Sequence, residues 1–421
     1  MKLRAAWILG VGGLCAGLAI FAACVGDTPI TPIPDAGGSN DTGATNDTGT
    51  VNDSGAPDTA ITCTAPLTNC ANFCVDLTRD KANCGACGHS CLGAACGASK
   101  CAVQIVASGL SNPYIAANST TPDVIVVASS DALKDGGTPS GGLYRIAKPS
   151  GAPVKMWTSP FYAMNRDFNN QLSTIAVGGT KAYMISVVGN TASLSYVDLN
   201  GAPGTAPTPI SIPNGSSLLL FVAASTTDAG SFVAAGSAYQ SYARANFDTP
   251  IPIFSTGGGA GIAFPDLPYI VIADNASSKN IVRCDRTVSI TACSGGGVDV
   301  YSGPLASNVK FLTAVGSTLY WVNEASTSTI VSCTLPTCTT PLVIASGEAD
   351  VGGLAIDVTG AYWTDPISGH IRACTDLSKG CAGASETRVD GQANATGITT
   401  DKDAIYWTIK LPAGSVRRIG K

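Results

Sequence analysis

The feature that most constrains the fold is a repeat in the last third of the sequence. A Tyr-Trp pair recurs at Tyr320, Tyr362 and Tyr406, at spacings of 42 and 44 residues. Each pair lies in a short apolar run bounded by turn-forming residues, which is the pattern of a β-strand. Repeats of about 40–45 residues that hold several short strands are typical of propeller blades. The repeat therefore predicts a β-propeller built from small antiparallel sheets.

Two series of strands extend this repeat toward the N-terminus. Weaker copies of the Tyr-Trp strand, without Trp, begin at Asp123, Lys181, Gly230 and Tyr269, which gives seven core strands with the three above. Seven outer strands that end near a turn begin at Val103, Val154, Thr208, Ile251, Val298, Pro341 and Glu386. The first outer strand precedes the first core strand, so the segment at Val103 is expected to complete the last blade.

Such closure would remove the exposed edges that an open array of sheets leaves. We therefore predict an all-β chain whose residues 103–421 form a seven-bladed β-propeller closed by an N-terminal strand, with six blades as the alternative. Composition agrees, because only 13% of the residues are charged while Gly numbers 48, which suits strands and tight turns. The net charge of -5 argues against the basic footprint of a nucleic-acid-binding protein.

The tetrad Tyr362-Trp363-Thr364-Asp365 resembles the YWTD repeat of low-density-lipoprotein-receptor propellers and related NHL-type propellers. The resemblance implies that the aromatic residues pack between blades and that the acid fixes neighbouring backbone. Asn323 and Ile409 stand where the family has Asp, so the resemblance predicts a fold and no receptor function. The residues expected to have this packing role are Tyr320, Trp321, Tyr362, Trp363, Asp365, Tyr406 and Trp407.

Residues 1–24 read as a signal peptide. Lys2 and Arg4 precede an apolar run over 5–22, the arrangement of a secretory leader. The run ends in "FAAC", which resembles a bacterial lipobox and implies lipidation of Cys24; cleavage after Ala23 or an uncleaved anchor are the alternatives. Val25 is not the Asp typical of inner-membrane retention, so the resemblance favours a lipid-anchored protein of the outer membrane or cell surface, with a periplasmic or secreted protein as the alternative.

Residues 25–62 are predicted to form a disordered acidic linker. The segment repeats "NDTG" or "NDSG" at a period of six and carries aspartates but no Lys or Arg, so it has too little apolar surface to order itself. One carboxylate every six residues is sparse for a calcium loop, which gathers several oxygens in a tight turn. The linker is therefore expected to act as a tether.

Residues 63–101 form a cysteine-dense module. A segment this short cannot bury a sufficient core, so disulfides are expected to stabilise it, in a connectivity that the sequence does not choose. The spacing of Cys84, Cys87 and Cys91 around His89 leaves zinc as an alternative. The run from Asn83 to Cys101 resembles the stigma-specific cysteine-rich family and implies no enzymatic activity. The eight cysteines are Cys63, Cys70, Cys74, Cys84, Cys87, Cys91, Cys96 and Cys101.

Six further cysteines form three close pairs, each after the core strand of its repeat. Cysteines that flank a loop between paired strands can lie at disulfide distance. We predict the disulfides Cys284–Cys293, Cys333–Cys338 and Cys374–Cys381. This pairing leaves no lone thiol to act as a nucleophile.

The motifs of the common hydrolases, metalloproteases and phosphate-binding loops are missing from the sequence. Asp357 and Asp401 recur at one repeat position and read as turn residues, and His370 has no partner histidine. Carboxylates from different blades could still converge on the channel. We predict no enzyme activity and no cofactor, but a monomeric binding protein for a protein, peptide or glycan, held to the membrane only by its lipid anchor. A polymer-degrading lyase or hydrolase and an envelope structural protein are the alternatives.

Overall fold

The computed structural model describes residues 61–110, 113–120, 123–130, 141–159, 175–188, 191–210, 222–224, 233–237, 240–243, 251–254, 259–266, 269–274, 280–285, 297–381, 385–410 and 414–421. The signal peptide, Cys24 and nearly all of the predicted linker lie outside these ranges. The described residues belong to one compact unit, Ala60–Lys421. Within the described ranges, no helix has the length and hydropathy needed to cross a bilayer.

Seven four-stranded antiparallel sheets lie within the described ranges. Six of them follow the chain order from the innermost to the outermost strand. They are β6 (Pro113–Thr120), β7 (Asp123–Ser130), β8 (Gly141–Ala147) and β9 (Val154–Ser159); β10 (Ile175–Gly178), β11 (Lys181–Val188), β12 (Thr191–Asp198) and β13 (Thr208–Ile210); β14 (Val222–Ala224), β15 (Val233–Ser237), β16 (Gln240–Ala243) and β17 (Ile251–Phe254); β18 (Gly259–Ala263), β19 (Tyr269–Asp274), β20 (Asn280–Asp285) and β21 (Val298–Ser302); β22 (Val309–Val315), β23 (Thr318–Glu324), β24 (Ser328–Thr334) and β25 (Leu342–Glu348); and β26 (Gly353–Asp357), β27 (Gly360–Asp365), β28 (His370–Cys374) and β29 (Glu386–Val389).

The remaining sheet joins the two ends of the propeller sequence. It consists of β30 (Ala395–Thr400), β31 (Ala404–Ile409), β32 (Gly414–Gly420) and, at its outer edge, β5 (Gln104–Leu110). In the register of this pair Val416 lies opposite Ala107 and Arg418 opposite Gln104. We call this sheet the closing blade, the sheet of β26–β29 the YWTD blade and the sheet of β6–β9 the first blade.

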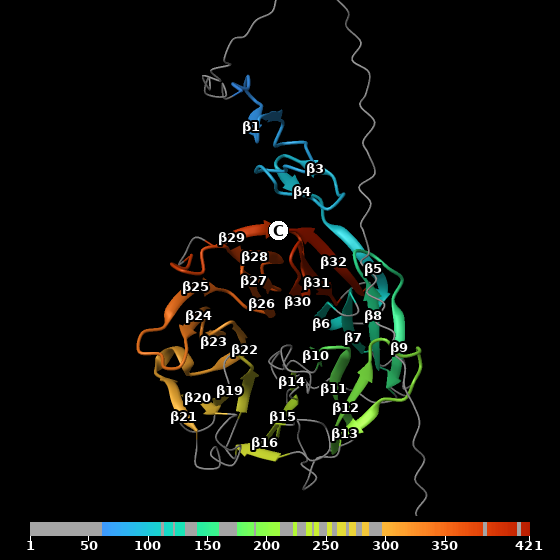
Figure 1. Ribbon diagram of the computed structural model, residues 1–421, viewed down its shortest axis with the longest axis vertical. Helices are drawn as coiled ribbons and strands as arrows, with labels where there is room; N and C mark the ends of the chain where they lie inside the picture. Colours follow the sequence, from blue (N-terminus) through green and yellow to red (C-terminus); the bar gives the residue numbers. More distant parts are fainter. Residues whose placement is uncertain are drawn as a thin grey trace, which may run out of the picture. The chain divides into compact units, whose positions relative to one another are not determined.

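The innermost strands contact one another in the order β6, β10, β14, β18, β22, β26 and β30, and β30 contacts β6. The sheets therefore form a closed ring, which Figure 1 shows with β6, β10, β22, β26 and β30 around its centre. The prediction of an all-β propeller is confirmed, and an N-terminal strand completes the last sheet. A short 3-10 turn, η2 (Pro304–Ala306), is the other regular element described within the ring.

The Tyr-Trp strands are buried because both of their faces are covered by neighbouring sheets. Trp321, Trp363 and Trp407 have no exposed surface, and each belongs to an apolar cluster that combines residues of two adjacent sheets. Trp363, for example, shares its cluster with Tyr320 and Val322 of the preceding sheet. Large aromatic side chains supply most of the apolar area in such contacts, so the repeat holds each blade to the one before it.

The cysteine-rich module consists of two small hairpins and four disulfides. β1 (Thr68–Cys70) pairs with β2 (Phe73–Val75), and β3 (Cys96–Gly97) pairs with β4 (Lys100–Cys101). The sulfur atoms of Cys84, Cys91 and Cys101 lie within 4.8 Å of one another, but each is already bonded to another sulfur, so the structure favours disulfides over zinc. The bonds are Cys63–Cys74, Cys70–Cys87, Cys84–Cys96 and Cys91–Cys101.

Two of the three disulfides predicted for the propeller, Cys333–Cys338 and Cys374–Cys381, are present. Each closes the loop between the third and the fourth strand of its sheet. Cys284 is also disulfide-bonded, and Cys293, its predicted partner, lies outside the described residues.

Candidate functional site

Two aspartates at equivalent repeat positions organise the turns between the first and second strands of their blades. Asp357 Oδ1 accepts a hydrogen bond of 2.7 Å from the Thr359 amide. Asp401 Oδ1 accepts bonds of 3.0 and 2.9 Å from the amides of Asp403 and Ala404. This is the turn role expected for the two residues, and it leaves the Oδ2 atom of each carboxylate facing the next blade.

Two lysines, each from the next blade around the ring, contact these Oδ2 atoms. Lys148 and Lys421 each follow the third strand of a blade, and their amides donate to the carbonyls of Asp123 and Asp403. Because these backbone bonds match, the two lysines occupy the same repeat position.

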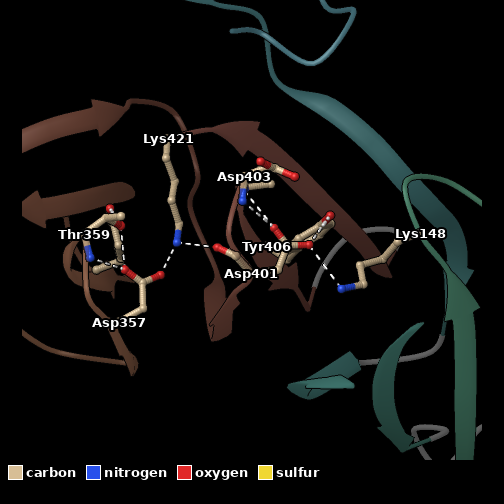
Figure 2. A network of polar contacts seen from close by, with 9 residues as sticks. Lys148, Asp357, Thr359, Asp401, Asp403, Tyr406 and Lys421 are labelled. Carbon is tan, nitrogen blue, oxygen red and sulfur yellow. Dashed lines mark hydrogen bonds and ion pairs between the residues drawn. The ribbon is translucent and has the colours of Figure 1, made fainter. Parts of the chain in front are cut away.

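The side chains of both lysines cross an interface between blades. Lys148 Nζ of the first blade donates to Asp401 Oδ2 of the closing blade at 3.1 Å, and Lys421 Nζ donates to Asp357 Oδ2 of the YWTD blade and to the Asp401 carbonyl. Figure 2 shows the two lysines on either side of Asp401. The closing blade is thus tied by a Lys–Asp bridge to each of its neighbours.

We call Asp357, Asp401, Lys148 and Lys421 the turn network. Its charges are arranged as in a structural contact. Burial disfavours the charge on Asp401, but the amides of Asp403 and Ala404 and the ammonium of Lys148 outweigh it and hold the pKa of the carboxyl below its ordinary value. Burial raises the pKa of Tyr406, whose hydroxyl donates to Asp401 Oδ2 at 3.1 Å, to about 12. Such groups keep one protonation state at neutral pH, so they are poor candidates for proton transfer.

A second charged cluster lies at the opposite ends of the strands, between the sheet of β22–β25 and the YWTD blade. Lys310, the second residue of β22, is nearly fully buried and pairs with Glu324 at the end of β23. The Asn308 side chain donates to Glu324 Oε2 at 3.0 Å. Asp350 belongs to the same electrostatic environment, and so does the buried Asp365. We call Lys310, Glu324, Asp350 and Asp365 the Lys310 cluster.

Within the Lys310 cluster, Asp350 differs from the aspartates of the turn network. Desolvation raises its pKa above the ordinary value, Lys310 partly offsets this, and Glu324 and Asp365 raise it further. Carboxylates of adjacent blades therefore converge here, as the sequence left open.

Buried polar side chains also hold the Trp residues in place. Trp363 Nε1 donates to Glu348 Oε2 and Trp407 Nε1 to Gln392 Oε1, both at 3.1 Å and both fifteen residues upstream. An arginine completes each site, since Arg372 pairs with Glu348 at 3.1 Å and Arg417 donates to Gln392 at 2.9 Å. Trp321 instead donates to a carbonyl, that of Leu305, at 2.6 Å.

The other two candidate residues from the sequence, Asp365 and His370, contact neighbouring residues of the chain. Asp365 is buried and accepts the Ser368 amide at 3.0 Å, which is how the resemblance expects this acid to fix backbone. His370 lies at the start of β28, with Nε2 3.4 Å from Asp390 Oδ1. The residues that were not identified from the sequence are Lys148, Lys421, Glu348 and Gln392. Their regular positions were a usable signal, because Glu348 and Gln392 lie fifteen residues before a Trp and each lysine directly follows the third strand of its blade.

The fold agrees with known structures. No family model and no curated protein matches the chain. The WD40 β-propeller domain of Doa1 is 10% identical, covers 75% of this chain and 96% of its own, and superposes with a TM-score of 0.52. BamB from Moraxella catarrhalis is 13% identical over 77% of this chain and 84% of its own, with a TM-score of 0.41. A chain of the nidogen/laminin complex is 14% identical over 64% of this chain and 82% of its own, with a TM-score of 0.38. At these identities the comparisons establish a β-propeller and nothing finer.

Proposed function

We propose that this chain is a non-enzymatic binding protein outside the cytoplasm, tethered to the outer membrane or cell surface by a lipid on Cys24. Every cysteine in the described ranges is disulfide-bonded, which fits an oxidising compartment. Its propeller would present one end of the ring to a protein, peptide or glycan. No cofactor is needed for this role.

The observation that carries the proposal is that the carboxylates are balanced by lysines at one end of the strands and concentrated at the other. At the end of the strands that carries the turns of Asp357 and Asp401 (the turn end), these partly buried carboxylates are neutralised by lysines of neighbouring blades. At the other end, the carboxylates of Glu324 and Asp365 both raise the pKa of Asp350 in the Lys310 cluster, and Glu324 is partly exposed. We expect a partner that brings cationic or hydroxyl groups to bind at the Lys310 end, since such groups complement a local concentration of carboxylates.

A binding screen tests this proposal. The chain with Cys24→Ala, exported as a soluble protein, is titrated with cationic peptides and with envelope glycans. We expect one class to bind saturably, and Glu324→Gln to weaken that binding about tenfold. Lys402→Met, at an exposed position of the turn end, is the matched control and should bind like the wild type. A folded protein that binds neither class, or equal effects of both variants, would contradict the proposal and favour an envelope structural protein.

The raised pKa of Asp350 beside Glu324 favours one second candidate, a hydrolase or lyase acting on an extracellular polymer. General acid catalysis uses a carboxyl whose pKa is raised and that lies near a second carboxyl group. Turnover of an envelope polysaccharide that is abolished by Asp350→Asn, and retained by Lys402→Met, would support this candidate. Saturable binding without turnover would exclude it in favour of the binding protein.

A further inference from the structure

The cysteine-rich module contacts the two strands that close the ring. β5 begins three residues after Cys101, and its first residue, Gln104, accepts a hydrogen bond of 2.6 Å from Arg418 Nε of β32. The Leu92 carbonyl of the module accepts bonds of 3.4 Å from both Arg418 Nη2 and Gln104 Nε2. One backbone atom of the module is therefore shared by the N-terminal and the C-terminal strand of the closing blade.

Apolar packing extends this contact. Cys91, Ala94 and Cys101 are buried in the same cluster as Ile405 and Ile419 of the closing blade. Leu92 packs against a second cluster, which includes Val106, Ala107 and Tyr406. Without the module these parts of β5, β31 and β32 would lose part of their cover.

The backbones also approach each other closely. A Cβ atom placed on Gly420 would lie 2.1 Å from the carbonyl oxygen of Ser90, a distance that requires the backbone of one partner to move. By contrast, a Cβ atom on Gly97, in the β3 hairpin, would meet nothing within 4 Å. Glycine at position 420 thus permits the module to lie directly on β32.

We infer that the cysteine-rich module is a clamp on the ring closure, and that the Cys91–Cys101 disulfide makes this closure depend on oxidation. The disulfide fixes both ends of the segment 92–100, which carries Leu92, next to the start of β5. A dithiol reductant would give two thiols at Cys91 and Cys101 and would itself become a disulfide. The freed segment gains conformational entropy, the Leu92 contacts loosen, and β5 exposes the edge of β32.

The Cys374–Cys381 disulfide provides a matched comparison. It closes a loop of similar length, but within the YWTD blade and away from β5. Its removal should loosen that loop and leave the closure intact. Loss of Cys91–Cys101 is thus expected to loosen the closing blade, whereas loss of Cys374–Cys381 is expected to loosen only its own loop.

Hydrogen exchange on the full chain tests the inference. In the double variant Cys91→Ser/Cys101→Ser, amides of Gln104–Leu110 should exchange about tenfold faster or more than in the wild type. In Cys374→Ser/Cys381→Ser, the exchange of β5 should be unchanged. Equal exchange of β5 in the wild type and the first variant, or equal acceleration in both variants, would overturn the inference.

A second experiment keeps every disulfide and so does not depend on folding without one. Gly420→Ala should displace the module from β32, and a dithiol should then reduce Cys91–Cys101 faster than in the wild type, as measured by thiol labelling and mass spectrometry. Gly97→Ala should react at the wild-type rate. If Gly420→Ala and Gly97→Ala are reduced equally fast, the module does not clamp the closure.

Discussion

At the scale of single residues, the position of Lys148 shows how a charge is used inside this ring. Its side chain is 5% exposed and lies between Asp401 of the closing blade and Asp123 of its own blade. A buried lysine is tolerated only when it is paired and hydrogen-bonded, and here both carboxylates provide that pairing. The residue therefore acts as a contact between blades that are distant in sequence.

Lys148→Met should lower the free energy of unfolding by about 2 kcal/mol, because Asp401 would keep its charge without its partner. Urea unfolding measures the change. Lys402→Met removes a lysine that is 88% exposed and that, among the described residues, pairs with the adjacent surface residue Asp403, so its effect should stay below about 0.5 kcal/mol. Equal effects of the two substitutions would show that the bridge contributes nothing to stability.

Asp401 and Asp350 should make the free energy of unfolding depend on pH in opposite directions. Asp401 has a folded-state pKa below the unfolded value of about 3.9, so its contribution is present above that value and is lost as the pH falls through the folded pKa. Asp401→Asn should flatten this acid loss of stability. A variant with the same acid profile as the wild type would contradict the assignment.

Asp350 should behave in the opposite way. Its folded-state pKa is raised, so the folded chain binds the proton more tightly and the group gives more stability as the pH falls from neutral toward the unfolded pKa. Asp350→Asn, which removes a half-buried charge, should raise the melting temperature at pH 7 and leave it nearly unchanged below pH 4. A decrease in the melting temperature at pH 7 would show that the charge on Asp350 is stabilising.

At the scale of the element, the repeat supplies its own comparison of two polar sites. Glu348 and Gln392 accept the indole N–H of Trp363 and Trp407 at the same offset, and each contacts an arginine. The structure therefore shows that a neutral amide is accepted at this position of the blade. The carboxylate at Glu348 adds charge to a contact whose geometry an amide can also provide.

Glu348→Gln should accordingly destabilise the chain by only about 1 kcal/mol, while Glu348→Leu should cost about 3 kcal/mol because Arg372 and the Trp363 N–H lose their acceptor. Denaturant unfolding of both variants checks the order. A similar loss for both would mean that the charge, and not the hydrogen bonds, is what this position requires.

The sequence predicts the strands of this fold better than the contacts between its blades. The Tyr-Trp strands were found because their residues recur, and recurrence needs no knowledge of the fold. The pairing of Lys148 with Asp401 spans 253 residues, and it exists only because the ring brings the first blade beside the last. Likewise Asp365 comes near Asp350 and Glu324 only because two blades pack together, whereas Lys310 meets Glu324 within the pairing of β22 with β23. The module contacts at Leu92 and Gly420 have no sequence pattern at all, since they involve backbone atoms.

At the scale of the whole molecule, several independent contacts secure one place in the ring. The closing blade takes its outer strand from the N-terminal side of the propeller, receives a Lys–Asp bridge from each side and is covered by the disulfide-rich module. A propeller is weakest where its two chain ends meet, because that sheet is held only by non-covalent pairing.

The structure makes β5 an integral strand of this ring, and hydrogen exchange of the wild-type chain can test this pairing. If it is correct, the paired amides of Gln104–Leu110 should exchange as slowly as those of Ala404–Ile409 in the buried strand β31, and both should report the same global unfolding. If Gln104–Leu110 exchanges at the rate of an unstructured peptide while Ala404–Ile409 remains protected, the ring is not closed by this strand and the account is wrong.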